Sequence, residues 1–319
     1  MLIGDGNIKI IDLLDISSRI STFRKNNSMG KYKSLELALA EVAQKNERMK
    51  NATHYIDFNS NIFGQTMDER FIKMFQNGSG SELMVKGSSV KSSSMLGYNF
   101  FHWISKERPI VIDGIEYTDV AFEVKIPVLK IGGPANMDVV LYNIDKGNVL
   151  FIESKFLEYV STEAFKLKPS YHAPKRYYNL ERGERWTKFI KEYDTSAPKQ
   201  YWPGIKQEIC HLIGLSNWIN DDINISVNGS SINKDGNIRF INLIFQPDKE
   251  QFNKEYAKFN SYTELYKEFH NSVENAGLIP TPLKMEFKTY SDIWSNIKSS
   301  AQSELIDYLY EHYMQFAAK

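Results

Sequence analysis

Cysteine is almost absent from this sequence, which has a single one, Cys210, in 319 residues. A lone cysteine excludes an internal disulfide framework, and the 6 histidines show no paired spacing with it or with each other that resembles a zinc site. We therefore expect a fold held by its hydrophobic core, in a reducing, cytoplasmic location.

Long apolar runs are absent as well, since no uninterrupted stretch approaches the ~20 residues that span a bilayer. The N-terminal segment 1–6 meets charged residues before any long apolar run, so neither secretion nor membrane association is expected. Net charge is also missing, because Lys+Arg and Asp+Glu are equal at 39 each. Any surface that binds nucleic acid must therefore be local.

What the sequence does contain is enough hydrophobic residues, 42%, to bury a substantial core. Helical spacing of apolar residues predicts helices at 34–49 and 204–218, and Ser92 to Ser94 suit the cap of an apolar run at 95–104. Short β-branched and aromatic runs at 121–128, 137–142 and 149–156 predict an antiparallel meander. A further strand is expected at 237–246, and the tail from 252 to 316 is expected to be mostly helical.

Two strands of the meander carry the residues with the clearest chemistry. If the turn Asp145-Lys146-Gly147-Asn148 is centred between Lys146 and Gly147, Asp138 faces Lys155 across the hairpin. Glu153 lies two residues before Lys155, so the alternation of a strand puts both side chains on one face together with Asp138. Two acids and one lysine are therefore expected to converge.

Phosphodiester hydrolysis has a use for such a group. Two carboxylates can hold Mg²⁺, with Mn²⁺ as a substitute, to neutralise charge on the scissile phosphate. The lysine can orient or deprotonate the attacking water or counter charge in the transition state, and burial can lower its pKa toward neutrality.

Competing interpretations remain open at this point. A Glu-x-Lys pattern also occurs at Glu123-Val124-Lys125 and Glu286-Phe287-Lys288, and exposed strands often carry alternating charges. Asp113 together with Glu123-Val124-Lys125 is a rival site, although Asp113 lies in an apparent turn. A structural salt bridge between Asp138 and Lys155 is the other alternative. Acids placed inside apolar strands are costly without a function, which favours the site.

The segments 133–140 (GPANMDVV) and 151–158 (FIESKFLE) resemble the core of a restriction-endonuclease group in the PD-(D/E)XK nuclease superfamily. The resemblance extends to segments 92–101 and 207–215, so that it covers about residues 80 to 250. One departure is Met137, which stands where the superfamily's name has proline.

The resemblance implies an α/β (α+β) fold with a central mixed sheet flanked by helices. Residues 76–250 would form the nuclease core, 1–75 a helical N-terminal extension packed on it, and 251–319 a C-terminal helical segment of the same domain. It also implies residue roles: Asp138 and Glu153 as metal ligands, the Ser154 carbonyl as a third ligand, Lys155 as the catalytic lysine, Gln207 as a helix glutamine near the site, and Glu82 as an extra acid. An exposed helix cap is the alternative for Glu82.

A local basic excess lies between Lys166 and Lys206, with 10 Lys or Arg against 4 Asp or Glu and aromatic residues interleaved. These basic side chains can bind phosphates while the rings pack on sugars or bases. The alternative is a solvated connection whose aromatic side chains turn to the core. Lys91, in the serine-rich segment 88–94, can contact phosphate in the same way. The expected nucleic-acid contacts are Lys91, Lys175, Arg176, Arg182 and Arg185.

Together these features predict a Mg²⁺-dependent endonuclease that cuts DNA, in a restriction or other defence system. RNA stays open as a substrate, and a homodimer is open because cutting both strands of a duplex often needs two active sites. The alternative is a non-catalytic module of the same fold that binds nucleic acid or a protein partner. Cys210 and His211, adjacent on a helix, point about 100° apart and are interpreted as packing residues.

Overall fold

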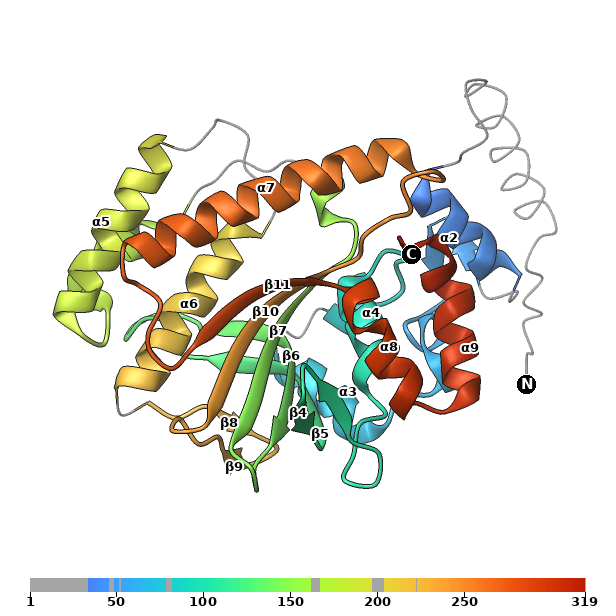
Figure 1. Ribbon diagram of the computed structural model, residues 1–319, viewed down its shortest axis with the longest axis horizontal. Helices are drawn as coiled ribbons and strands as arrows, with labels where there is room; N and C mark the ends of the chain where they lie inside the picture. The colour runs from blue at the N-terminus through green and yellow to red at the C-terminus, as the bar shows by residue number, and fades with distance from the viewer. Residues whose placement is uncertain are drawn as a thin grey trace, which may run out of the picture.

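A five-stranded mixed sheet organises the chain in this computed structural model, which describes residues 34–45, 49–51, 53–78, 82–161, 167–196, 204–221 and 223–318. Its strands lie in the order β11-β10-β7-β6-β5 (Figure 1). Their bounds are β5 Asp119–Ile126, β6 Ala135–Asn143, β7 Asn148–Lys155, β10 Asn237–Ile244 and β11 Lys284–Thr289.

The predicted meander is confirmed: β5, β6 and β7 pair antiparallel, whereas β10 runs parallel to β7 and β11 parallel to β10. The expected hairpin register is wrong by two residues. Asn143 lies opposite Asn148 and Val139 opposite Ile152, so the turn is 144–147. Gly147, at φ 65°, supplies the left-handed residue that closes this turn. Asp138 therefore comes opposite Glu153, and Lys155 lies diagonal to it.

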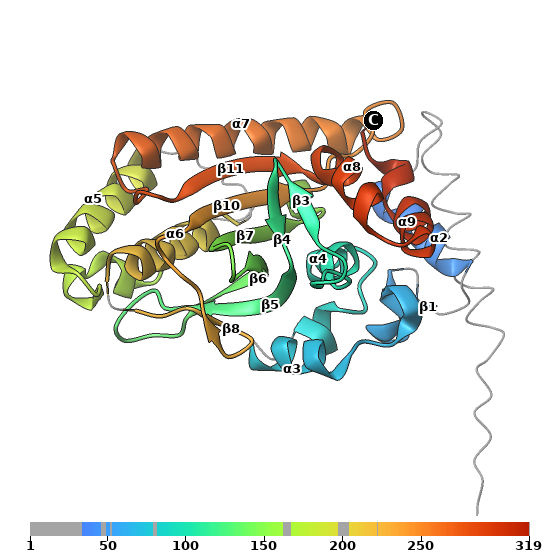
Figure 2. The same ribbon diagram turned by 60° about the horizontal axis from the view of Figure 1, so that its bottom comes forward.

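Helices cover both faces of the sheet (Figures 1 and 2). They are α2 Leu35–Gln44, α3 Glu69–Asn77, α4 Ser93–Phe101, α5 Leu180–Ser196, α6 Ile205–Asn220, α7 Asn253–Asn275, α8 Tyr290–Ser300 and α9 Ser303–His312. The helices predicted near 34–49, after Ser92 and at 204–218 are confirmed as α2, α4 and α6. The Ser92 hydroxyl caps α4 by accepting from the Met95 amide at 3.3 Å.

Two glycines set how closely the helices approach the sheet. On α4, a Cβ at Gly97 would lie 3.1 Å from the Val139 side chain, and on α6 a Cβ at Gly214 would lie 2.4 Å from that of Ile126. Both helices can therefore pack tightly only because these positions lack side chains. The polar end of the sheet is enclosed between them.

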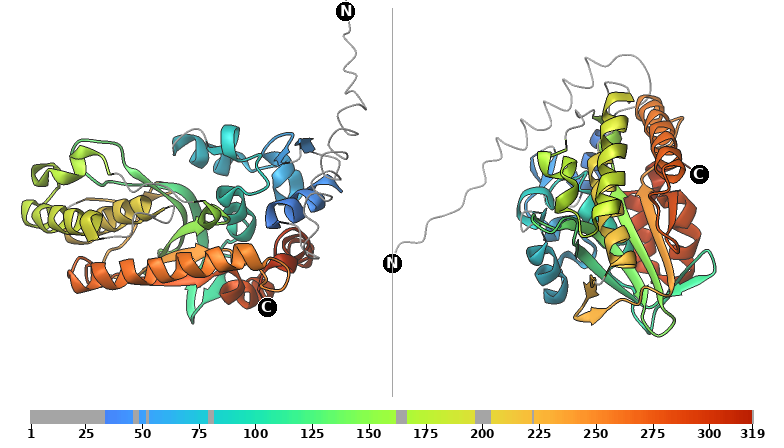
Figure 3. Two further views of the ribbon diagram at one scale, coloured as in Figure 1. Left: turned by 90° about the horizontal axis from the view of Figure 1, so that it is seen from above. Right: turned by 90° about the vertical axis from the view of Figure 1, so that its left-hand side faces the viewer.

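Two stretches contain elements that were not expected. The tail is mostly helical, as predicted, in α7, α8 and α9, but it also contains β11, which completes the sheet at its edge. The alternating pattern Lys-Met-Glu-Phe-Lys-Thr is the strand pattern that the helical interpretation overlooked. The polar segment 157–200 contains a helix that was not predicted, α5, and its Trp186, Phe189 and Ile190 pack into the core, as the interpretation of a connection with aromatics turned to the core had it. Figure 3 shows α5 and α6 at one end of the molecule and α2, α8 and α9 at the other.

Residues 1–33 of the expected N-terminal extension lie outside the described residues, and its described part is not purely helical. It contains a hairpin of β1 (Met49–Asn51) and β2 (His54–Tyr55), the 3-10 turns η1 (Asn59–Asn61) and η2 (Phe63–Gln65), and α3, inside which the expected boundary at residue 75 falls. Phe71 and Phe75 of α3 pack on Phe122 of β5. Buried side chains from all three expected segments thus share one hydrophobic core.

The remaining elements are short. They are β3 Ile110–Ile112, β4 Ile115–Tyr117, β8 Ser226–Val227, β9 Ser230–Ser231, the π-helix η3 Glu82–Lys86 and the 3-10 turns η4 Glu158–Val160, η5 Pro169–His172, η6 Pro174–Arg176 and η7 Met314–Phe316. Among the described helices, none has the length and apolar character needed to cross a bilayer.

Candidate active site

The candidate site lies where β6 and β7 part. Their pairing ends at Val139 and Ile152, and beyond it the Asp138 Oδ2 atom accepts a hydrogen bond from the Ser154 amide at 2.8 Å. Because the N–H and C=O of a strand residue point toward the same neighbour, the Ser154 carbonyl points to the side on which this carboxylate lies. Two oxygen groups therefore come together in the gap between the strands.

Glu153 and Lys155 complete the group on the face of the sheet that α6 covers. The Lys155 ammonium donates to Glu153 Oε1 and, at 2.9 Å, to Oε1 of Gln207 at the start of α6. Glu153 and Lys155 are both buried. Within the described residues no ion pair joins Lys155 to Asp138, so the salt bridge considered from the sequence is replaced by one along the strand.

Electrostatics at this site are unbalanced toward negative charge. Asp138 keeps some exposure as a residue, but desolvation of its carboxyl and the charge of Glu153 raise the pKa of Asp138 to about 8. Burial by itself would lower the pKa of Lys155, but the charges of Glu153, Glu158 and Asp138 outweigh it and raise that pKa above its usual range. The surrounding acids therefore prevent the lowering of the lysine pKa that burial alone could cause, and they favour the charged form of Lys155.

A second layer of buried polar side chains lies behind these residues. His211 on α6 donates from Nε2 to the Asn136 carbonyl at 3.0 Å, which places Nδ1 3.3 Å from Glu153 Oε2. Burial lowers the pKa of His211 to about 4, so the ring is neutral near pH 7. Interpreting His211 as a packing residue missed this contact. Cys210, by contrast, turns away and donates to the Tyr171 hydroxyl at 3.2 Å.

Glu208 is a further site residue that sequence reasoning missed. It is fully buried next to Asn242, whose amide lies 3.4 Å from Glu208 Oε1, and the Tyr262 hydroxyl donates to the same asparagine at 3.2 Å. Burial and the charge of Glu153 raise the pKa of Glu208 to about 8. The signal was available: Glu208 and His211 are three apart and share a helix face with the apolar Leu212 and Leu215.

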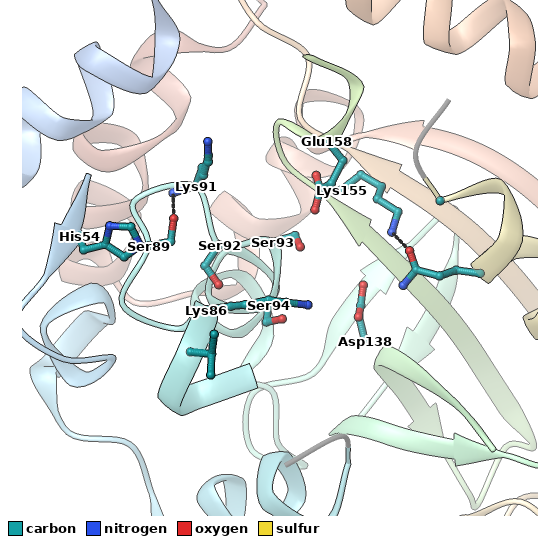
Figure 4. Close-up of a pocket in the computed structure, with 13 residues that line it drawn as sticks. His54, Lys86, Ser89, Lys91, Ser92, Ser93, Ser94, Asp138, Lys155 and Glu158 are labelled. Carbon is teal, nitrogen blue, oxygen red and sulfur yellow. Dashed lines mark hydrogen bonds between the residues drawn. The ribbon is translucent and has the colours of Figure 1, made fainter. Parts of the chain in front are cut away.

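Asp138 and Lys155 open into a cavity of about 450 Å³ (Figure 4). Its opposite wall contains the serines at the start of α4, and in Figure 4 the side chain of Lys86 extends along this wall toward Asp138. The two walls are tied together, because the Ser154 hydroxyl donates to the Ser93 carbonyl at 3.0 Å. The cavity is lined by His54, Val85, Lys86, Ser89, Lys91, Ser92, Ser93, Ser94, Asp138, Lys155, Glu158, Gly204 and Gln207.

The expected nucleic-acid contacts separate into two groups. Arg182 pairs with Asp221, and Arg185 donates to the Gly277 and Ala276 carbonyls after the end of α7, so both serve contacts within the protein. Lys175 and Arg176 are exposed on η6. Lys91 lines the cavity but pairs with Glu36 at 3.0 Å.

Two other expectations concern acids outside the gap. Glu82 lies in η3 by its backbone, but its side chain is outside what the structure describes. The rival site around Asp113 is not assembled with Glu123 and Lys125: Asp113 pairs with Arg239 and Lys288, and Lys125 is exposed. Glu123 is nevertheless notable, because it adopts φ 52° in β5 beside Asp138's strand, a conformation that favours glycine.

Comparison of the chain with protein-family models, with curated proteins and with solved structures gives no match. Among the described residues, no three His, Cys, Asp or Glu side chains group closely enough to form a metal site by themselves. The donors at the gap are instead two carboxylates and a main-chain carbonyl. This is a set typical of Mg²⁺, which is held by one or two carboxylates and keeps several waters.

Proposed function

We propose that the protein is a Mg²⁺-dependent DNA endonuclease with a restriction-endonuclease-like core of the PD-(D/E)XK type. The observation that carries this proposal is the grouping of Asp138, Glu153 and Lys155 where β6 and β7 part. Asp138 and Lys155 line an open cavity, and the buried Glu153 carboxylate holds Lys155. The order of the strands supports it as well: an antiparallel meander followed by parallel strands, with helices on both faces.

Metal binding is supported by the charge state of the site. The carboxyl of Asp138 has a raised pKa because it lies desolvated beside Glu153, and a divalent cation between the two would relieve that repulsion. Asp138, Glu153 and the Ser154 carbonyl would hold the ion. When bound, Mg²⁺ would neutralise charge on the scissile phosphate and lower the pKa of a bound water.

Lys155 then acts as a fixed cation. Glu153 and Gln207 hold its ammonium group, and its raised pKa keeps it protonated throughout the neutral range. A protonated lysine cannot take a proton from water, but it can orient that water and counter the negative charge that develops on the phosphoryl group. Gln207, which accepts from Lys155, positions it.

The test is cleavage by the purified protein. Plasmid, linear and single-stranded DNA, unmodified and methylated, would be incubated with Mg²⁺ or Mn²⁺ beside samples in EDTA, with RNA as a further substrate. We expect metal-dependent breaks in DNA that Glu153→Ala abolishes. Cleavage that persists in EDTA, or no cleavage of any substrate by a folded protein with either metal, contradicts the proposal.

A further inference from the structure

A second cavity, of about 500 Å³, adjoins the candidate active site. It is lined by Lys50, Asn51, His54, Ile56, Asp57, Phe58, Leu83, Val85 and Ser88. His54 and Val85 line both cavities, so the two lie next to each other; together they are called the groove below. Each half lies within the about 300–1,000 Å³ that nucleotide-sized ligands occupy.

The chemistry changes along this groove. Near Asp138 the walls carry hydroxyl groups and lysines, whereas beyond His54 four apolar side chains, Ile56, Phe58, Leu83 and Val85, lie among the polar ones. Ile56 and Val85 are 58% and 66% exposed and line the same cavity, so they form a shared apolar surface and not single scattered side chains. The half-buried Phe58 lies between the groove and the core. Lys50 and Lys86 supply positive charge at the two halves. The acid in the second half, Asp57, is turned back to cap the Ser60 amide at 2.8 Å.

The groove is built on fixed backbone. The buried Asn61 amide donates to the carbonyls of Gly87 and Ser89, both at 2.8 Å, and the Tyr55 amide donates to the Ser88 carbonyl at 2.8 Å. At the junction, the His54 ring bonds through Nδ1 to the Thr53 hydroxyl at 2.9 Å. The walls are therefore pre-formed, which lowers the ordering cost of binding.

We propose that this groove binds an unpaired stretch of the DNA strand that is cut, and that the enzyme prefers substrates with a single-stranded segment; the inference rests on the proposed function. Unpaired bases expose faces that pack on apolar and aromatic side chains, and their phosphates are met by lysines. A continuous duplex buries its base faces and presents phosphates, with which exposed isoleucine and valine side chains make no favourable contact. The arginines that could widen a duplex-binding surface, Arg182 and Arg185, are engaged within the protein.

Binding is tested without cleavage. The anisotropy of a fluorescent oligo(dT) of about 15 nucleotides, the upper range of one single-strand site, would be measured in EDTA beside a blunt duplex of the same length. We expect tighter binding of the single strand, and a loss of about tenfold in its affinity in the double variant Ile56→Ser/Val85→Ser. The control is Val111→Ser/Ile144→Ser, which removes two exposed apolar side chains from β3 and from the β6–β7 turn.

The outcomes separate this inference from the proposed function. Equal or tighter duplex binding, or unchanged single-strand binding in the groove variant, overturns the inference whatever the protein cuts. A single-strand preference that is lost in the groove variant and kept in the control supports it, even if cleavage fails and the proposed function with it. Because all four positions are exposed, circular dichroism melts are expected to show intact folds.

Discussion

The fold contains two clusters with the same three residue types, an aspartate and a Glu-x-Lys pair on a strand of the five-stranded sheet. Asp138 meets Glu153 and Lys155 at one, and Asp113 meets Glu286 and Lys288 at the other, where Lys288 lies 3.1 Å from Asp113 and 4.0 Å from Glu286. Only the second contains an arginine. Arg239 is buried and donates to Glu286 at 2.7 Å and to Asp113.

The arginine changes what each cluster can do. Around Arg239 two acids meet two bases, so the charges balance, and despite desolvation the hydrogen bonds from Arg239 and Lys288 hold the pKa of Asp113 below its usual range. Around Lys155, Asp138, Glu153 and Glu158 share one base, and the pKa of Asp138 rises to about 8. A balanced cluster stabilises the fold, whereas one with excess negative charge is suited to a cation.

The largest expected effect separates the two clusters by activity. Asp138→Ala, Glu153→Ala and Lys155→Ala should each lower kcat/KM for DNA cleavage by about a thousandfold, because each removes a group that acts on the reacting phosphate. Their matched counterparts Asp113→Ala and Glu286→Ala should stay within about threefold of wild type. Initial rates on one labelled DNA substrate measure this, and similar losses in both sets would remove the distinction.

Arg239→Met should show the reverse behaviour. It leaves two acids near a buried position without their partner, so the free energy of unfolding should fall by about 3–5 kcal/mol. Cleavage by the fraction that stays folded should be unchanged. Urea denaturation monitored by tryptophan fluorescence gives the free energy, and a stability equal to wild type would show that the arginine cluster does not hold the sheet together.

The two aspartates should respond to pH with opposite signs in EDTA. The pKa of Asp138 is raised on folding. The contribution of this carboxyl to the free energy of unfolding is therefore fully present below pH about 4 and is lost as pH rises through about 8. Asp138→Asn should therefore be more stable than wild type at pH 8, by on the order of 1–3 kcal/mol, with little difference near pH 4.

The pKa of Asp113 is lowered on folding. The contribution of this carboxyl to the free energy of unfolding is therefore present at pH values above its pKa in the unfolded chain and is lost as pH falls through the lowered pKa. Asp113→Asn should be less stable than wild type at neutral pH and approach it in acid. Thermal melts from pH 4 to pH 9 measure both variants. Parallel curves for the two would show that their charge environments are alike.

Glu208→Gln should have the smallest effect. Because the raised pKa of Glu208 keeps its carboxyl neutral at pH 7, glutamine preserves both shape and charge, and the melting temperature should move by no more than about 2 °C. Cleavage should fall by no more than about threefold. A loss as large as that of Glu153→Ala would instead make Glu208 an ionised member of the site.

Much of this arrangement could be predicted from the sequence because its signals are local. The meander, the cap at Ser92 and the Glu153–Lys155 spacing follow from periodicity and turn residues. The hairpin register could not be predicted in this way, because the sequence around Asp145 to Asn148 is equally compatible with a turn at 144–147 and a turn at 145–148. A register error of two residues leaves every side chain on the same face of the sheet. The prediction that the acids and the lysine share one face is therefore unaffected by it.

What could not be predicted depends on long-range contacts. From the sequence, burial could lower the pKa of Lys155 toward neutrality, but the direction of the shift depends on how many acids surround the lysine in three dimensions. Likewise, Arg182 and Arg185 look like nucleic-acid contacts in a basic segment until α7 and Asp221 are placed beside them. The role of β11 as an edge strand was similarly hidden in a tail of helical segments.

The central claim is that the Asp138 cluster, and not the Asp113 cluster, holds a divalent cation. Calorimetric titration of the protein with Mn²⁺ at pH 8 tests it most directly, using wild type, Asp138→Ala and Asp113→Ala. We predict heat of binding at one site in wild type and Asp113→Ala and none in Asp138→Ala. Binding that survives Asp138→Ala, or that is absent from wild type, would contradict the claim.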